Sequence, residues 1–265
     1  MKFLRFIFEN YPEGSFGIIE EEKVRVLSGD PLYSIEKTPE LIPLKAIKEF
    51  LPPIDPPNII ALGGNYREHV KESKAQIPSH PLIFIKSTNT LTAHKQPIVL
   101  PKEAPDEVDY EVELAVVIKD RIKDIAEKEA LKHVFGYTIG QDISARDCQL
   151  KYDQQWARGK SFDTFCPLGP WIETELDSEN VVLRTILNGE IMQEESTSDM
   201  IFPVSYLVSY ISRMMTLFPG TIIMTGTPDG VGFSRKHPVF LRKGDNLISE
   251  IEGIGRMENY LVKEK

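Results

Sequence analysis

The segment that most constrains the fold is an apolar run, residues 108–118, which carries acidic side chains near its start. Side chains alternate along a strand, so Glu111 and Glu113 would share one face with Ala115 and Val117. The opposite face would be wholly apolar. Burying an ionised carboxylate without a partner is costly, and two neighbouring carboxylates repel each other. The segment therefore predicts a strand buried on both faces with a cation beside its glutamates, unless its first residues lie in solvent.

A third acidic residue, Asp142, follows a predicted strand at 135–141 and precedes a predicted helix at 144–155 with Ser144 as its N-cap. Together with the two glutamates it makes an all-oxygen set. Hard oxygen ligands favour Mg²⁺, Mn²⁺ or Ca²⁺ over zinc. The alternative is that the strand start is exposed and both glutamates are solvated, since glutamate is rarely buried.

The rest of the chain predicts an α+β fold that is rich in strands. Strands do not alternate regularly with long helices, which argues against a doubly wound sheet. Asn188-Gly189 predicts a hairpin between strands at 181–187 and 191–195. Further strands are expected at 3–8, 15–19 (after a turn at 12–14), 23–27, 58–62, 82–86, 222–225 and within 239–262. Helices are expected at 43–50, 65–74, 125–131 and 203–217.

Four prolines within residues 51–57 mark a stiff linker. We therefore expect a small β-rich N-terminal module over residues 1–55 and a larger domain over residues 56–265.

The composition excludes several classes of function. A net charge of −9 and the lack of a basic stripe argue against nucleic-acid binding. The two cysteines, Cys148 and Cys166, have no zinc-site spacing and predict reduced thiols in the cytosol. The N-terminus does not resemble a signal peptide, and no apolar run approaches the roughly 20 residues of a membrane span. We expect a cytoplasmic protein that acts on a small molecule.

Five short motifs then occur in order from about residue 58 to the C-terminus. They are Gly64-Asn65-Tyr66 with His69 and Glu72; Asp109 to Leu114; Gly136-Tyr137 with Asp142, Arg146 and Asp147; Gly159 to Asp163; and Pro219-Gly220 with Thr225 to Gly232. Each motif alone is unspecific, but the ordered set resembles the fumarylacetoacetate hydrolase family. The short N-terminal module is similar to that of its small bacterial-type members, while Thr221 stands where many relatives have Asp.

The resemblance implies a mixed β-sheet roll or sandwich core with a few flanking helices. It also implies that Glu111, Glu113 and Asp142 bind Mg²⁺ or Mn²⁺, with Ca²⁺ as a substitute. A mobile lid over residues 65–80 would carry a catalytic dyad of His69 and Glu72, whose i,i+3 spacing places both on one helical face.

The resemblance gives further residues a role as well. Lys160 would stabilise negative charge or move a proton. Substrate contacts would come from Arg146, Gln149, Thr227, Tyr66 and Asp163. Members of the family are usually homodimers, which we carry over as an expectation.

The implied activity is a metal-dependent reaction on a small 2-oxo acid through a metal-stabilised enolate. The dyad favours C–C bond hydrolysis of an acylpyruvate or fumarylacetoacetate type. The alternatives are a 2-hydroxyhepta-2,4-diene-1,7-dioate isomerase or decarboxylase and an oxaloacetate decarboxylase. A non-enzymatic, cation-stabilised binding protein would explain the acids but would leave the dyad and Lys160 without a role.

Overall fold

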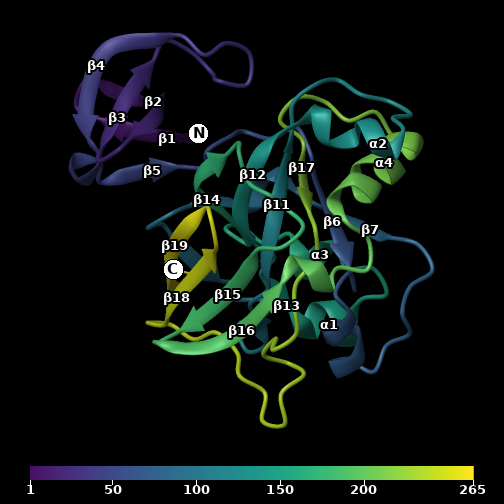
Figure 1. Cartoon of the computed structure of the whole chain (residues 1–265). Helices are drawn as coiled ribbons and strands as arrows, with labels where there is room; N and C mark the ends of the chain where they lie inside the picture. The colour runs from purple at the N-terminus through teal and green to yellow at the C-terminus, as the bar shows by residue number, and fades with distance from the viewer. Residues whose placement is uncertain (265) are drawn as a thin grey trace.

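The computed structural model describes residues 1–264, which form a 12-stranded mixed sheet, a five-stranded sheet and a few short helices (Figure 1). The large sheet has the order β4-β3-β2-β1-β14-β12-β11-β17-β6-β7, with β5 beside β1 and β8 beside β14. The second sheet has the order β16-β15-β18-β19-β9. Parallel pairs, such as β17 with β6 and β19 with β9, occur among antiparallel ones. The predicted β-rich fold with mixed sheets and few helices is confirmed.

The elements have the following bounds. The large sheet contains β1 (Lys2–Phe8), β2 (Tyr11–Glu20), β3 (Lys23–Leu27), β4 (Lys37–Pro43), β5 (Glu49–Leu51), β6 (Ile59–Gly63), β7 (Leu82–Lys86), β8 (Leu91–Ala93), β11 (Val112–Ile118), β12 (Val134–Gln141), β14 (Cys166–Glu173) and β17 (Ile222–Met224). The second sheet contains β9 (Pro97–Leu100), β15 (Val182–Leu187), β16 (Glu190–Ser196), β18 (Asn246–Ile251) and β19 (Gly255–Lys263), and β10 (Val108–Asp109) pairs with β13 (Ser144–Ala145). The α-helices are α1 (Arg67–Glu72), α2 (Glu127–Ala130), α3 (Ala157–Lys160) and α4 (Val204–Met214).

Strand β11 lies at the centre of the core, between β12 and β17. All of its residues are buried; Leu114 and Val116 face one hydrophobic cluster, and Ala115 and Val117 face another. Glu113 has no exposed surface and the neighbouring Glu111 is only 6 % exposed. The alternative of solvated acids at the strand start is therefore wrong.

Helix α4 covers the first of these clusters with one apolar face. Leu207, Val208 and Ile211 are buried against it, as expected for apolar residues at helical spacing. The predicted hairpin is confirmed too, because β15 and β16 are joined through Asn188 and Gly189 with φ of 52° and 89°. No helix within residues 1–264 is both long enough and apolar enough to cross a bilayer.

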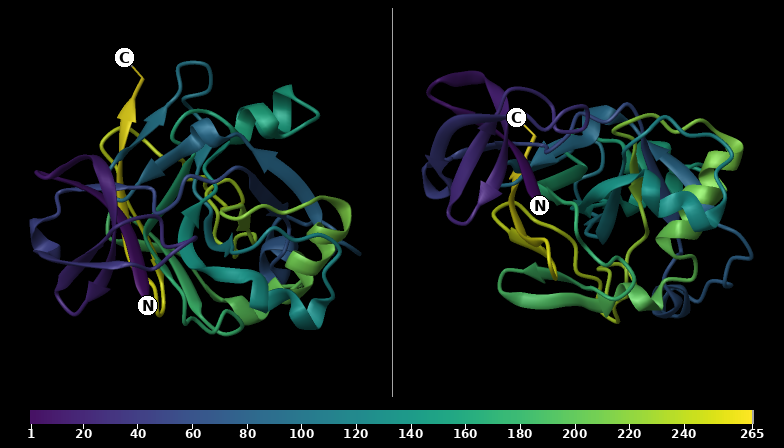
Figure 2. Two further views of the ribbon diagram at one scale, coloured as in Figure 1. Left: turned by 90° about the horizontal axis from the view of Figure 1, so that it is seen from above. Right: turned by 45° about the horizontal axis from the view of Figure 1, so that its top comes forward.

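The N-terminal strands gather at the end of the molecule opposite α4 in both views of Figure 2. Strand β1 pairs with β14 through Lys2↔Glu173 and Phe3↔Ile172, so these strands continue the large sheet. They also have a hydrophobic cluster of their own, with Phe6 and Val24 among its members. On this basis we propose a separate module over residues 1–55.

The predicted helix at 43–50 is wrong. A single 3₁₀ turn, Leu44–Ala46, is followed by β5, which pairs with β1. Phe50 is buried within that pairing, and the prolines that follow favour extended backbone. The expected turn at 12–14 lies inside β2 instead, and the chain reverses at residues 9–10.

The predicted helix at 144–155 is confirmed only in part, because helical backbone is limited to residues 146–152. Ser144 is not an N-cap but pairs with Asp109 across β10 and β13. A π-helical turn, Cys148–Tyr152, follows and is capped by the Asp147 side chain, and α3 begins only at Ala157. Tertiary pairing outweighs local helix propensity here. The expected helix at 125–131 is shorter as well, with α2 limited to Glu127–Ala130.

Candidate active site

The three predicted metal ligands come together at one end of β11 and β12. Glu111 lies between β10 and β11, Glu113 lies within β11, and Asp142 follows β12. The backbone N–H of Asp142 donates to the Glu111 carbonyl over 2.9 Å, which brings the two chain segments together. One carboxylate oxygen from each of the three residues lies within 4.8 Å of the others.

Buried cations surround two of these carboxylates. Lys160 Nζ lies 2.8 Å from Glu111 Oε2 and 2.5 Å from Asp142 Oδ2. Lys86 Nζ lies 2.6 Å from Asp142 Oδ1, and Arg146 Nη2 lies 2.6 Å from Glu111 Oε1. Each carboxylate oxygen of Glu111 and Asp142 therefore has a positive partner.

Glu113 differs from both neighbours. Among residues 1–264, no Lys or Arg side chain forms an ion pair with it. Its Oε2 accepts a hydrogen bond from the Gly226 N–H over 2.7 Å, but its Oε1 is buried without a partner. Burial, reinforced by the charges of Asp142 and Glu111, raises the pKa of Glu113 well above its usual range. An unpaired buried oxygen beside two further carboxylates fits a divalent cation such as Mg²⁺ or Mn²⁺.

The Glu111 carboxylate and the Lys160 ammonium keep each other in the charged form. Burial opposes ionisation of Glu111, but Lys160 and Arg146 outweigh it and hold the pKa of this carboxyl well below its usual range. Burial also opposes the charge on Lys160, yet Asp142 and Glu111 raise the pKa of its ammonium. The cluster thus keeps Lys160 as a cation next to the acids.

Asp109 links the cluster to the loop that follows β17. Its Oδ2 accepts from Arg146 Nε over 2.9 Å and from the Phe233 N–H over 3.0 Å. Its Oδ1 accepts from the Gly232 N–H over 2.8 Å. The Phe233 ring in turn lies 4.3 Å from the Arg146 guanidinium. Asp109 therefore orients Arg146 and fastens the 230–233 loop with the same carboxylate.

The His69–Glu72 dyad forms on α1 as its spacing suggests. His69 Nδ1 lies 2.9 Å from Glu72 Oε1, and the Glu72 carboxylate also accepts from the Gly230 N–H at 3.1 Å. Burial opposes ionisation of Glu72, but the hydrogen bonds from His69 and Gly230 outweigh it and lower the pKa of this carboxyl. Glu72 therefore fixes the imidazole and attaches α1 to the 230–233 loop.

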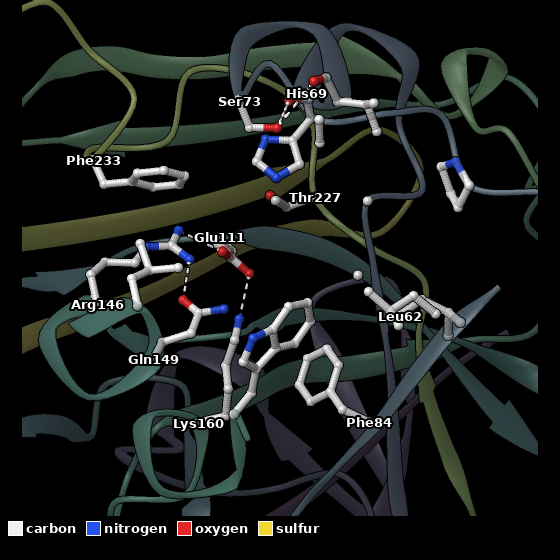
Figure 3. Close-up of a pocket in the computed structure, with 18 of the residues that line it drawn as sticks. Leu62, His69, Ser73, Phe84, Glu111, Arg146, Gln149, Lys160, Thr227 and Phe233 are labelled. Carbon is white, nitrogen blue, oxygen red and sulfur yellow. Dashed lines mark hydrogen bonds and ion pairs between the residues drawn. The ribbon is translucent and has the colours of Figure 1, made fainter. Parts of the chain in front are cut away.

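A cavity of about 360 Å³ joins these groups. Its polar half is lined by His69, Glu111, Arg146, Gln149, Lys160 and Thr227. Figure 3 shows the His69 ring on one side of Glu111 and the Lys160 ammonium on the other. The arrangement places an imidazole and an ammonium on opposite sides of a position next to the acidic cluster.

Two other predicted substrate contacts do not line this cavity. Tyr66 is fully buried in the core beneath α1, where its hydroxyl has no hydrogen-bond partner. Asp163 lies past α3, where it accepts a hydrogen bond from Asn89 Nδ2 over 2.5 Å. Gln149 is in place and accepts from Arg146 Nη1 over 2.8 Å.

Sequence reasoning missed Lys86 and gave Asp109 no role. Lys86 ends an apolar strand, and its side chain has no exposed surface; a lysine in that position was the available signal. Asp109 stands at the start of the same run as the two glutamates. The order of the strands decides which cation pairs with which carboxylate, and the sequence does not give that order.

Comparisons with known proteins identify the family. Residues 58–262 match the family described as fumarylacetoacetate (FAA) hydrolase C-terminal, and residues 1–53 match the Rv2993c-like, N-terminal family. Rattus norvegicus oxaloacetate tautomerase Fahd2a, a mitochondrial protein, is 42% identical over 225 residues, covering 84% of this chain and 72% of that protein. A Dictyostelium discoideum fumarylacetoacetate hydrolase domain-containing protein 2 homolog is 46% identical over 78% of this chain and 72% of its own length.

Solved structures are similar over the whole length. The 5-carboxymethyl-2-hydroxymuconate delta-isomerase of Mycobacterium smegmatis is 39% identical with a TM-score of 0.89, covering 100% of both chains. The fumarylacetoacetate hydrolase of Exiguobacterium antarcticum is 34% identical with a TM-score of 0.90, again over 100% of both chains. Family model, relatives and solved structures agree, and this chain is an enzyme of the fumarylacetoacetate hydrolase family.

Proposed function

We propose that this protein transfers a proton at the carbon beside the keto group of a 2-oxo acid, as a tautomerase or isomerase. The observation that supports this is that His69 and Lys160 line one cavity together with Glu111 of the acidic cluster. Related proteins named as an oxaloacetate tautomerase and as a hydroxymuconate isomerase support the same class of reaction.

Glu111, Glu113 and Asp142 would hold a Mg²⁺ or Mn²⁺ ion, which supplies a Lewis acid for a keto or carboxylate oxygen when bound. Glu72 occupies Nδ1 of His69, which leaves Nε2 as the nitrogen that exchanges a proton with the substrate. The proton leaves the carbon next to the keto group. It is returned either to the keto oxygen, which gives the enol, or to the far carbon of a conjugated double bond, which gives an isomer. The composition of the substrate is unchanged.

Lys160 and Arg146 would contribute charge rather than protons. The charge of Lys160 is secured by Asp142 and Glu111, so its ammonium can stabilise negative charge on a substrate oxygen throughout the reaction. Arg146 is held by Asp109 and Gln149, and its rigid position suits a carboxylate of the substrate.

A second candidate is C–C bond hydrolysis, which the His69–Glu72 pair favours because a carboxylate-supported imidazole can activate water. The hydroxide would add to the acyl carbon. The C–C bond would then break, with its electron pair moving to the carbon beside the keto group, and that carbon would take up a proton. The products would be two acids rather than one isomer.

The two candidates are separated by following 2-oxo acids in D₂O by NMR, with Mg²⁺ or Mn²⁺ present. Deuterium exchange beside the keto group without cleavage indicates proton transfer, and two product acids indicate hydrolysis. His69→Gln should slow either reaction by about 100-fold or more. The matched control is His133→Gln, because His133 also pairs with a carboxylate, Asp120 at 3.1 Å, but does not line the cavity. Equal rates in wild type and His69→Gln would contradict the proposal.

A further inference from the structure

The cavity has a second half whose chemistry differs from that of the first. The cavity is also lined by apolar side chains, among them Leu62, Leu82, Phe84 and Trp156. Figure 3 shows Leu62 and Phe84 together on the side away from Arg146 and Gln149. A bound 2-oxo acid with its head at the acidic cluster would extend its remaining chain toward this wall.

The part of the apolar wall formed by Leu62, Phe84 and Trp156 is held in place by packing. Phe84 and Trp156 meet edge to face with ring centroids 5.4 Å apart, and adjacent strands β6 and β7 carry Leu62 and Phe84. Gly63 makes room for the indole, since a Cβ there would lie 2.8 Å from Trp156 Cζ3. Phe84 and Trp156 therefore form a preformed apolar surface.

The charged side chains that line the cavity all belong to its polar half. Among the described residues these are Glu111, Arg146 and Lys160, with His69 as a further titratable group. Glu111 is ion-paired to both of the others. Lys160 Nζ also lies 5.2 Å from the Phe84 ring centroid, but its charge is already paired with Glu111 and Asp142. A second carboxylate packed against Phe84 and Trp156 would therefore lose hydration without gaining an unpaired cation, which is unfavourable.

We propose that the substrate is a 2-oxo acid whose distal arm is apolar, an aryl or branched alkyl group that packs against Phe84 and Trp156. This rests on the proposed function, because the acidic cluster must hold the 2-oxo acid head for the arm to reach the wall. It separates this protein from relatives whose names specify substrates with a second carboxylate, such as oxaloacetate.

The test uses ligands with one head and different arms: oxalate itself and N-substituted oxamates that carry either a phenyl group or a carboxylate-terminated chain of similar length. Dissociation constants are measured by calorimetry with Mn²⁺ present. The phenyl arm should bind at least about tenfold more tightly than the carboxylate arm, as expected for apolar groups in a fitted pocket.

Leu82→Arg should reverse that preference by placing a cation at the wall. Leu82 is 49% exposed at the start of β7, so the substitution is tolerated by the fold. Ile85→Arg is the matched control, because Ile85 lies on the same strand at 48% exposure but does not line the cavity. It should leave both affinities unchanged.

The outcomes separate this inference from the proposed function. Tight binding of oxalate together with equal or tighter binding of the carboxylate arm in wild type would overturn the apolar subsite alone. Failure of oxalate and of every oxamate to bind in the presence of Mn²⁺ would overturn the proposed function and the subsite with it.

Discussion

Replacing Lys86 with Met should destabilise the protein strongly, although Lys86 does not line the cavity. The Lys86 side chain has no exposed surface, and its Nζ lies 2.6 Å from Asp142 Oδ1 while donating to the carbonyls of Lys160 at 2.5 Å and Ile143 at 3.3 Å. Methionine keeps the length and the apolar stem, so the change removes the charge and the hydrogen bonds with little loss of packing.

The expected loss of unfolding free energy follows from the Asp142 carboxylate, which loses one of its cations. Lys86→Met leaves Asp142 Oδ1 buried without a cation, although Lys160 still pairs with Oδ2. Breaking a buried ion pair costs about 3–5 kcal/mol of unfolding free energy, and the remaining lysine places the expected loss at the lower end, about 3 kcal/mol. For a chain of this size that corresponds to a fall in Tm of roughly 10 °C. Lys132→Met is the matched control, because Lys132 pairs with Glu129 while 69% exposed and should contribute less than about 1 kcal/mol.

Urea unfolding of both variants, in the presence of a chelator so that no ion offsets the charge of Asp142, measures the difference directly. A loss below about 1 kcal/mol in Lys86→Met, or equal losses in both variants, would refute the account of Lys86 as a required counter-charge.

Three further results are expected. Glu113→Gln should weaken Mg²⁺ and Mn²⁺ binding by about 100-fold or more in calorimetry, since it removes the carboxylate that lacks a cation; unchanged affinity would exclude Glu113 as a ligand. Because burial raises the pKa of Glu113 in the ion-free protein, a proton there competes with the metal, and the affinity for Mn²⁺ should fall as pH is lowered; an affinity independent of pH in calorimetry would argue against this. Burial, assisted by Lys95, lowers the pKa of His94 to about 4, so the unfolded chain binds the extra proton first and stability should fall as pH drops from about 6.5 to about 4. His94→Gln should lose this part of the pH dependence, about 2 kcal/mol after allowance for partial exposure, in urea titrations; an unaltered profile would assign the pH dependence to other groups.

Much of the site could be predicted because it depends on local rules. The two-residue period of a strand predicts that Glu111 and Glu113 lie together, and they do, although Glu111 precedes the first residue of β11. The three-residue spacing on a helix pairs His69 with Glu72. Both relations involve residues close in sequence.

The parts that could not be predicted depend on contacts distant in sequence. Lys86 meets Asp142 across 56 positions, so nothing near either residue indicates the pair. The helix expected at 144–155 begins later than predicted for the same reason, since Ser144 pairs with Asp109 instead of starting a helix. Local propensity is weak beside a strand pairing that also satisfies buried backbone groups.

The 230–233 loop has a consequence for how the two halves of the site communicate. Gly230 holds Glu72 of the dyad, while Gly232 and Phe233 hold Asp109, which holds Arg146 beside Glu111. The imidazole and the proposed cation site are thus both attached to the 230–233 loop. Thermodynamic reciprocity then applies: whatever an occupied cation site does to ligand affinity at His69, the ligand does equally to cation affinity.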